Sequence, residues 1–181
     1  MDFSSLKTAS AIPGAAAMIE TFRAIGYSLE TAVADIVDNS ISASARNVWI
    51  NRIWKGGDSV ITIRDDGHGM SGEEIIQAMR PGAQNPLEER SATDLGRFGL
   101  GLKTASFSQC RTLTVMSKIQ GQSPEFWTWS LDHVARCDRW ELVHWCPEGF
   151  EHELDDLASG TIVIWTDPDR IIPAATKAEN E

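Results

Sequence analysis

The order of the apolar patterns along this chain most constrains its fold. In the first half, apolar residues recur at helical spacing, for example Val33, Val37 and Ile41, and this period predicts a helix. In the second half, short runs rich in Trp, Val, Ile and Thr predict strands. A chain whose helices lie mainly in its first half and whose strands lie mainly in its second is typical of the α+β class, with helices on one face of a sheet.

The individual elements and the domain limits follow from the same patterns. The predicted helices cover residues 16–25, 29–45, 71–81 and 100–108. The predicted strands cover residues 48–53, 60–63, 112–118, 125–131, 140–145 and 161–165. The polar stretch Gly82–Arg97 has neither period, and long loops of this kind inside compact domains often act as lids. We therefore predict one domain over residues 16–172, between flexible segments at residues 1–15 and 173–181.

The charge of the chain limits its partners. Its 16 basic and 26 acidic residues give a net charge of −10, which disfavours sequence-independent nucleic-acid binding by this chain alone. Residues 138–181 carry 11 of the acidic and 3 of the basic side chains, so most of the surplus lies there. No apolar run approaches the length of a membrane span, and the first residues do not resemble a secretory signal. We therefore expect no membrane partner and a cytoplasmic location.

The cysteine and tryptophan residues favour structural roles. Cys110, Cys137 and Cys146 are odd in number and show no CxxC spacing, so the sequence indicates neither a disulfide framework nor a zinc site. The 7 Trp residues would suit a platform on which nucleic-acid bases stack, but no basic residues alternate with them. Core and sheet packing is therefore the favoured interpretation.

Two short acidic segments carry candidate chemistry. Asp35 and Asn39 lie four residues apart on one face of the predicted helix 29–45. There an Asn oxygen can ligate a divalent ion and a carboxylate can accept a proton, although a solvated stripe fits the same pattern. Residues 65–70, Asp-Asp-Gly-His-Gly-Met, follow a predicted strand. Their glycines let the backbone approach a flat ligand, and a carboxylate can accept hydrogen bonds from an exocyclic amine; the alternative is a tight turn.

A third segment, residues 96–103, is rich in glycine. It reads Gly-Arg-Phe-Gly-Leu-Gly-Leu-Lys and leads into the predicted helix 100–108. Backbone N–H groups beside glycines, the positive end of a helix dipole and a lysine charge all suit a phosphate group. A flexible entry into the helix fits the same pattern. The spacing matches neither a Rossmann fingerprint nor a Walker P-loop.

In this order, the three segments resemble the N, G1 and G2 boxes of the GHKL ATPases. That superfamily includes DNA gyrase B subunits, the ninety-kilodalton heat-shock chaperones, histidine kinases, MutL and the MORC proteins. The third segment is most similar to the MORC-like and MutL-like branch, and Gly160-Thr161 resembles the pair that closes the adenine pocket. The resemblance implies a Bergerat fold, which is a two-layer α/β sandwich with a mixed, mostly antiparallel sheet. It also implies binding of ATP and ADP together with Mg²⁺.

The resemblance implies roles for individual residues as well. Asp35 is expected to activate the attacking water, Asn39 to ligate Mg²⁺ and Asp65 to accept the adenine amine. Lys103 is expected to offset the phosphate charge. The other implied ligand-binding residues are Ala43, Gly67, Gly69, Met70, Gly96, Arg97, Phe98, Gly99, Leu100, Gly101, Leu102 and Thr161.

Two positions depart from the family pattern. Asp35 stands where the family usually has Glu. Its side chain is one methylene shorter, so its carboxylate sits about 1.5 Å further back, and we expect slow hydrolysis because a misplacement of about 1 Å can lower a rate about a hundredfold. Ser42 stands where the MORC-like pattern has Asp.

The expected function is an ATP-binding, slowly hydrolysing module whose lid closure promotes homodimerisation. The alternatives are a histidine kinase catalytic domain and a nucleotide-sensing module without turnover. In the gyrase, MutL and MORC branch, a second domain supplies a lysine to the γ-phosphate, and we expect this coupling domain to be absent from this chain. A DNA or protein client is not expected to bind through this part alone.

Overall fold

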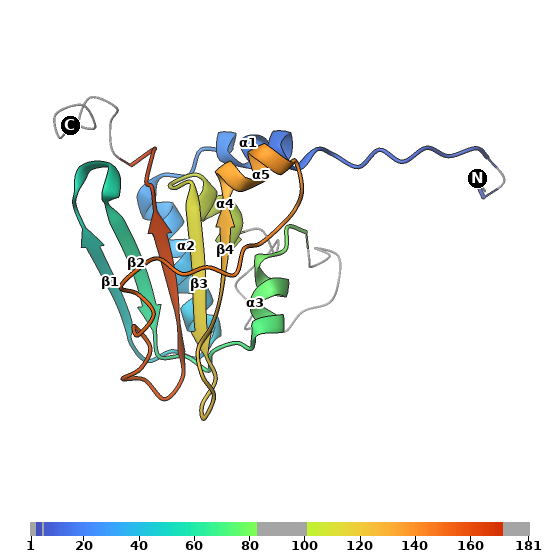
Figure 1. The fold of residues 1–181 in the computed structure, drawn as a ribbon. Coiled ribbons are helices and arrows are strands. Elements are labelled where there is room, and N and C mark those ends of the chain that lie inside the picture. The colour runs from blue at the N-terminus through green and yellow to red at the C-terminus, as the bar shows by residue number, and fades with distance from the viewer. Residues whose placement is uncertain (1–2, 5, 83–100, 172–181) are drawn as a thin grey trace.

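A five-stranded antiparallel sheet forms the centre of the computed structural model, which describes residues 3–4, 6–82 and 101–171 (Figure 1). The strand order is β1-β2-β5-β3-β4, and each pairing is antiparallel. The strands are β1 (Val48–Ile53), β2 (Val60–Asp65), β3 (Thr112–Lys118), β4 (Glu125–Ser130) and β5 (Gly160–Thr166). The last strand in the sequence therefore lies in the middle of the sheet.

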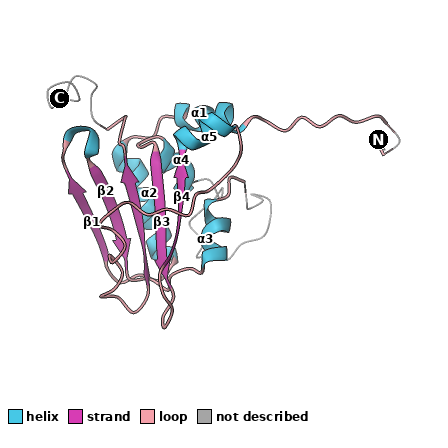
Figure 2. Cartoon of the chain, viewed as in Figure 1, coloured by secondary structure: helices cyan, strands magenta, loops and turns pink. Residues whose placement is uncertain are grey.

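Helices lie on one face of this sheet and at one of its ends (Figure 2). They are α1 (Ala15–Ala24), α2 (Leu29–Ser42), α3 (Gly72–Met79), α4 (Gly101–Phe107) and α5 (Leu131–Cys137). Side-chain caps start α2 and α3. The Ser28 side chain accepts a hydrogen bond from the Thr31 N–H at the start of α2, and Ser71 and Glu74 form a capping box at the start of α3, as these side chains do at many helix starts.

The two faces of the sheet build two apolar cores. Along β5, Val163 and Trp165 join the core beneath the helices, whereas Ile162 and Ile164 join a smaller core on the opposite face, because successive side chains of a strand point to opposite sides. The segment after α5 crosses that opposite face and contributes Leu154 to the smaller core (Figure 1). Burial on both faces explains why β5 reads as a continuous apolar run.

The structure confirms the α+β class and most predicted elements, with corrections in the second half. The described sheet contains antiparallel pairs throughout, where a mixed sheet was expected. Residues 140–145 form no strand, because turns surround Val143 and leave it a single bridge to Thr128. Helix α5 was not predicted; the Ser130 side chain accepts from the His133 N–H and ends β4 by starting this helix.

The two ends of the described chain differ in their contacts. Residues 6–14 run away from the body as an extended segment that exposes Leu6 and Ile12 (Figure 1). Residues 167–171 instead contact the end of α1, where Asp169 pairs with Arg23. Among the described helices, none combines the length and the apolar character needed to cross a membrane.

Candidate functional site

A buried carboxylate, Asp65, marks the centre of the candidate site. It is the last residue of β2, and 6% of its surface is exposed. Ser40 of α2 donates a hydrogen bond to Asp65 Oδ2 at 2.8 Å, and the Gly67 N–H donates to Oδ1 at 2.9 Å. These two bonds hold the orientation of the carboxylate while leaving lone pairs on both oxygens.

A second set of polar contacts, centred on Ser117, lies on the neighbouring strands β3 and β5. The Ser117 hydroxyl of β3 donates to the Gly160 carbonyl at 3.0 Å, lies 2.7 Å from the Thr161 hydroxyl and accepts from the Met70 N–H at 2.8 Å. The antiparallel register places Ser117 opposite Thr161 and Thr161 opposite Asp65. The sheet therefore places Thr161 beside Asp65, and Ser117 joins Thr161 to Met70 in the loop after β2.

Two glycines allow the loop after β2 to lie very close to α2 and β3. A Cβ at Gly67 would come within 2.8 Å of Ala43 Cβ, and a Cβ at Gly69 would come within 1.9 Å of the Lys118 carbonyl oxygen. The His68 N–H donates to the Ala43 carbonyl at 3.1 Å. Gly69 also has a φ of +73°, which glycine adopts far more readily than other residues. The loop after β2 is thus pressed against α2 and β3.

The predicted catalytic residue lies at the contact between α2 and α4. Asp35 is half-buried and Asn39 is exposed on the same helix. Asp35 Oδ2 lies 3.5 Å from where a Cβ of Gly101 would be, so the carboxylate faces the first residue of α4. Leu102, the next residue, packs partly buried against the core beneath the helices.

Lys103 turns toward α3. Its side chain is 3% exposed, and its Nζ donates to the Ala78 carbonyl at 2.8 Å. Burial lowers the pKa of Lys103 to about 8, because desolvation disfavours the charged form. For Lys103 to contact a phosphate group, its ammonium would have to leave the Ala78 carbonyl.

Part of the predicted site lies outside the described residues. The undescribed part includes most of the expected lid, residues 82–97, and the predicted ligand-binding residues Gly96, Arg97, Phe98, Gly99 and Leu100. The described part therefore comprises the group around Asp65, the Asp35–Gly101 contact and Lys103.

The sequence assigns no role to Ser40, which contacts Asp65, or to Ser117, which contacts Thr161. Ser40 follows Asn39 and lies four residues after the buried Ile36, so its inward position is readable from the helical period. Ser117 lies at the end of a predicted strand, and nothing local distinguishes it. Its role depends on the pairing of β3 with β5.

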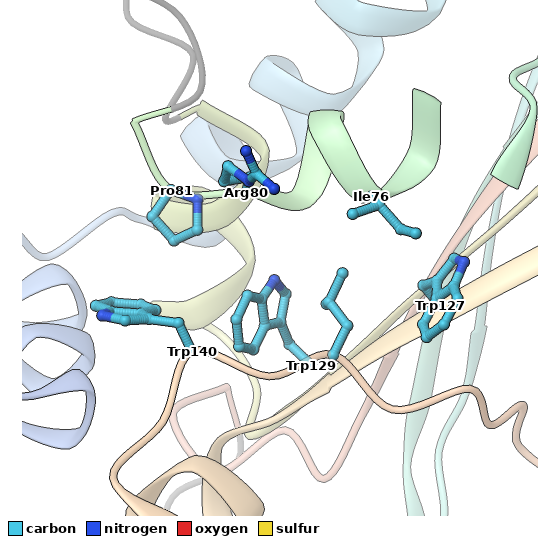
Figure 3. A pocket seen from close by; sticks show the side chains of 7 residues that line it. Ile76, Arg80, Pro81, Trp127, Trp129 and Trp140 are labelled. Atoms are coloured by element: carbon cyan, nitrogen blue, oxygen red, sulfur yellow. The ribbon is translucent and has the colours of Figure 1, made fainter. Parts of the chain in front are cut away.

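The tryptophans divide into core and surface positions. Trp129 and Trp165 are buried and Trp49 packs against its cross-strand partner Arg64, in agreement with the packing interpretation, whereas Trp54 and Trp145 are exposed and contradict it. A cavity of about 210 Å³ lies between the end of α3, β4 and the loop that follows α5 (Figure 3). Its lining residues are Ile76, Arg80, Pro81, Trp127, Trp129, Trp140 and Leu142.

The polar groups and glycines around Asp65 fit a flat heterocycle that carries an amine. The carboxylate is buried, acts only as an acceptor when ionised, and keeps lone pairs free. The glycines at 67 and 69 bring backbone rather than side chains to the site. The Asn39 side-chain oxygen is the kind of hard ligand that Mg²⁺ prefers, and the Asp35 carboxylate can accept a proton. The described parts of the first two sequence segments therefore lie close to one another, and the nucleotide site that the segments predict stays a prediction.

Comparison with known proteins identifies the family. Residues 27–161 match the family described as Histidine kinase-, DNA gyrase B-, and HSP90-like ATPase. The chain is 33% identical over 91 residues to ATPase morc-1 of Caenorhabditis elegans, which covers 50% of this chain and 10% of that protein. It is 37% identical over 97 residues to the DNA mismatch repair protein MutL of Thermus aquaticus, which covers 52% of this chain and 17% of that protein.

The match is long in this chain and short in its relatives. A MutL of Paramagnetospirillum magneticum is 29% identical over 132 residues, covering 72% of this chain and 21% of that protein. The chain thus spans only a small part of the curated relatives it matches. Because the family match covers α2, the loop after β2 and α4, this chain belongs to the histidine kinase-, DNA gyrase B- and HSP90-like ATPases, on the MORC and MutL side of that family.

Proposed function

We propose that this chain binds ATP in the presence of Mg²⁺ and hydrolyses it slowly. The observation that carries the proposal is the buried Asp65 carboxylate, which Ser40 and Gly67 orient and which Thr161 faces across the sheet. A carboxylate held in this way accepts a hydrogen bond from the adenine amine with little loss of side-chain entropy. The family match supports the same function.

The phosphate end of the site would lie along α2 and α4. Asn39 would ligate Mg²⁺, which offsets the phosphate charge when bound. Asp35 would accept a proton from the attacking water. The short side chain of Asp35 supports a slow rate, and it also keeps open the alternative of a nucleotide-sensing module without turnover.

The adenine assignment is tested by nucleotide binding to Asp65→Asn. We expect the natural chain to bind ATP with Mg²⁺ in the micromolar to millimolar range in isothermal titration calorimetry. The substitution should abolish binding, because an amide cannot accept bonds from Ser40, Gly67 and an amine as a carboxylate does. Circular dichroism would verify that the variant is folded.

Asp66→Asn is a matched control for this experiment. The Asp66 carboxylate accepts bonds from the Arg46 N–H at 2.7 Å and the Asn47 N–H at 2.8 Å, so it faces the loop after α2. This variant should bind ATP as the natural chain does. Unchanged affinity in folded Asp65→Asn would refute the adenine assignment.

We further propose that nucleotide binding closes the loop 82–97 and promotes dimerisation. The resemblance to gyrase-type clamps supports this, and so does the extended segment before α1, where 63% of Phe3, 59% of Leu6 and 82% of Ile12 are exposed. Apolar side chains in such a position favour a partner surface. Sedimentation velocity with a non-hydrolysable ATP analogue should show a dimer that is lost when residues 1–13 are removed.

A further inference from the structure

Three metal-ligating atoms lie together at the end of α5. His133 Nε2, Cys137 Sγ and a Glu141 carboxylate oxygen all lie within 4.8 Å of one another. His133 Nε2 is 3.2 Å from Glu141 Oε2, and Cys137 Sγ is 3.9 Å from the same oxygen. In a tetrahedral zinc site with ordinary bond lengths, neighbouring ligand atoms are about 3.4–3.8 Å apart. The cluster therefore needs only small side-chain rotations to surround an ion.

The fold holds these residues together through the backbone. His133 and Cys137 are four residues apart on α5, so they share one side of the helix. Asp138 ends the helix in the left-handed conformation, with φ at 48°, and turns the chain back. Val143 then forms two backbone hydrogen bonds with Thr128 of β4, both at 2.9 Å. This return places Glu141 against the helix.

Aromatic packing supports the same turn. The Trp140 ring lies 6.1 Å from that of Trp129 and 6.4 Å from that of Phe22, so the residue before Glu141 is anchored to the core. Arg139 Nε contacts Glu141 Oε1 at 3.1 Å and leaves Oε2 directed at His133 and Cys137. Such outer contacts orient the ligands of metal sites.

The ligand chemistry selects the kind of ion. Sulfur, imidazole nitrogen and carboxylate oxygen together suit borderline ions such as Zn²⁺, whereas Mg²⁺ and Ca²⁺ prefer oxygen ligands. All three side chains are half-buried, so an ion from solution can reach them.

We propose that His133, Cys137 and Glu141 bind one Zn²⁺ ion whose fourth position is open to water or an outside ligand. The ion would join α5 to the returning loop and so hold Asp138, whose Oδ1 accepts a bond from the Ala16 N–H at 3.0 Å at the start of α1. Helices α5 and α1 lie side by side at the end where the N-terminal segment leaves (Figure 1). Zinc would therefore stabilise the anchor of that segment.

Cobalt absorption tests the site with the full chain, purified without a metal-binding tag and treated with chelator. Adding Co²⁺ should produce the visible bands of tetrahedral cobalt and a near-ultraviolet band of thiolate-to-cobalt charge transfer, saturating at one ion per chain. Adding Zn²⁺ should remove both. A natural chain that shows no charge-transfer band would overturn the proposal.

Two variants test the ligands. Cys137→Ser should lose the charge-transfer band and bind Zn²⁺ about a hundredfold more weakly or worse, since even the loss of an outer group that orients a ligand costs about 10- to 100-fold. His133→Gln retains a hydrogen-bonding group for Glu141 but should weaken Co²⁺ binding similarly.

Cys146→Ser is the matched thiol control. This half-buried cysteine packs with the smaller core on the other face, and burial raises its pKa to about 11, so its removal should leave the spectrum unchanged. A band that persists in Cys137→Ser would show that the three residues are only a hydrogen-bonded cluster and would overturn the assignment. Zinc should also raise the melting temperature of the natural chain and of Cys146→Ser, but not that of Cys137→Ser.

Discussion

Among single residues, two adjacent carboxylates show how position in the fold assigns chemistry. Asp65 ends β2 with its oxygens buried against Ser40 and Gly67. Asp66 points the other way and accepts three hydrogen bonds from Arg46 and Asn47, and the bonds from Asn47 lower the pKa of Asp66. Of the two, only Asp65 is buried opposite Thr161, where we propose that the ligand binds, and Asp66 instead stabilises the loop after α2.

Asp35 is the residue on which turnover should depend. Asp35→Asn should lower an already slow release of phosphate by about a hundredfold or more, the usual range for a lost general base, while ATP affinity stays nearly constant. Asp35→Glu should raise the rate, because the longer side chain brings the carboxylate closer to the phosphate end. Steady-state phosphate assays check both. Equal release from all three proteins would remove Asp35 from the mechanism and favour the sensing module.

Gly69 should be the least replaceable glycine of the loop after β2. Gly69→Ala combines a φ of +73° with a Cβ placed 1.9 Å from the Lys118 carbonyl oxygen. We expect the free energy of unfolding to fall by about 3 kcal/mol or more, measured by urea denaturation. Gly121→Ala is the control, because Gly121 has a φ of +80° and open space around it. It should cost only about 1 kcal/mol, and equal losses would contradict the close contact.

Among the helices and strands, the end of α3 is held by side chains from other elements. Lys103 Nζ donates to the Ala78 carbonyl at 2.8 Å, and Trp129 Nε1 donates to the Met79 carbonyl at 3.0 Å. Both carbonyls belong to the last turn, which has no partners within the helix. A cation at this end also complements the helix dipole. These contacts fix α3 just before residue 83.

The buried ammonium should make stability depend on pH. Burial lowers the pKa of Lys103 from 10.5 to about 8. Between those values the unfolded chain still holds a proton that the folded chain has released, so the free energy of unfolding should rise as pH rises from about 8, by about 3 kcal/mol at most. Lys103→Met should lack this rise, measured by urea denaturation across that range without nucleotide.

Lys55→Met provides the control for this pH dependence. Lys55 is exposed, so its removal should leave the profile of the natural chain unchanged. Parallel profiles for the natural chain and Lys103→Met would show that Lys103 is not desolvated in the fold.

Across the entire fold, Arg23 joins segments that are far apart in the sequence. It is 2% exposed and donates to the Phe107 carbonyl at 2.8 Å, to the Cys110 carbonyl at 3.0 Å and to Asp169 Oδ2 at 2.6 Å. One side chain of α1 thereby holds the end of α4, the start of β3 and the chain after β5. The Arg23 guanidinium therefore links the helix layer to the chain segments beside it.

Removing Arg23 should destabilise the chain as a unit. Arg23→Ala leaves two carbonyls and a carboxylate without their donor, and losses of about 3–5 kcal/mol are typical when one partner of a buried pair is removed. Thermal and urea denaturation should show a single transition at reduced stability. Arg52→Ala, at an exposed position, should change stability by less than about 0.5 kcal/mol. A similarly small change in Arg23→Ala would contradict this role.

Much of the fold could be predicted because its signals are local. The periods around Val33 and Val115, the cap at Ser71 and the glycines after Asp65 all act within a few residues. The strand prediction for residues 140–145 was wrong because contacts with residues distant in the sequence outweigh the local strand propensity. Residues 140–145 have strand-forming side chains, yet pairing beside β4 extends to Val143 alone.

The resemblance of the three segments, in their order, was enough to indicate the family, because the residues that carry it are close together in the sequence. Local spacing could not place Ser117 against Thr161, since the two residues are 44 positions apart and meet only through the register of β3 and β5. Nor could it bring Glu141 to His133 and Cys137. The missing CxxC pattern argued against zinc, but the left-handed turn at Asp138 and the return of the chain to β4 assemble the ligands in space. Contacts of this kind form only when the whole chain packs, because their energy comes from partners that are remote in sequence.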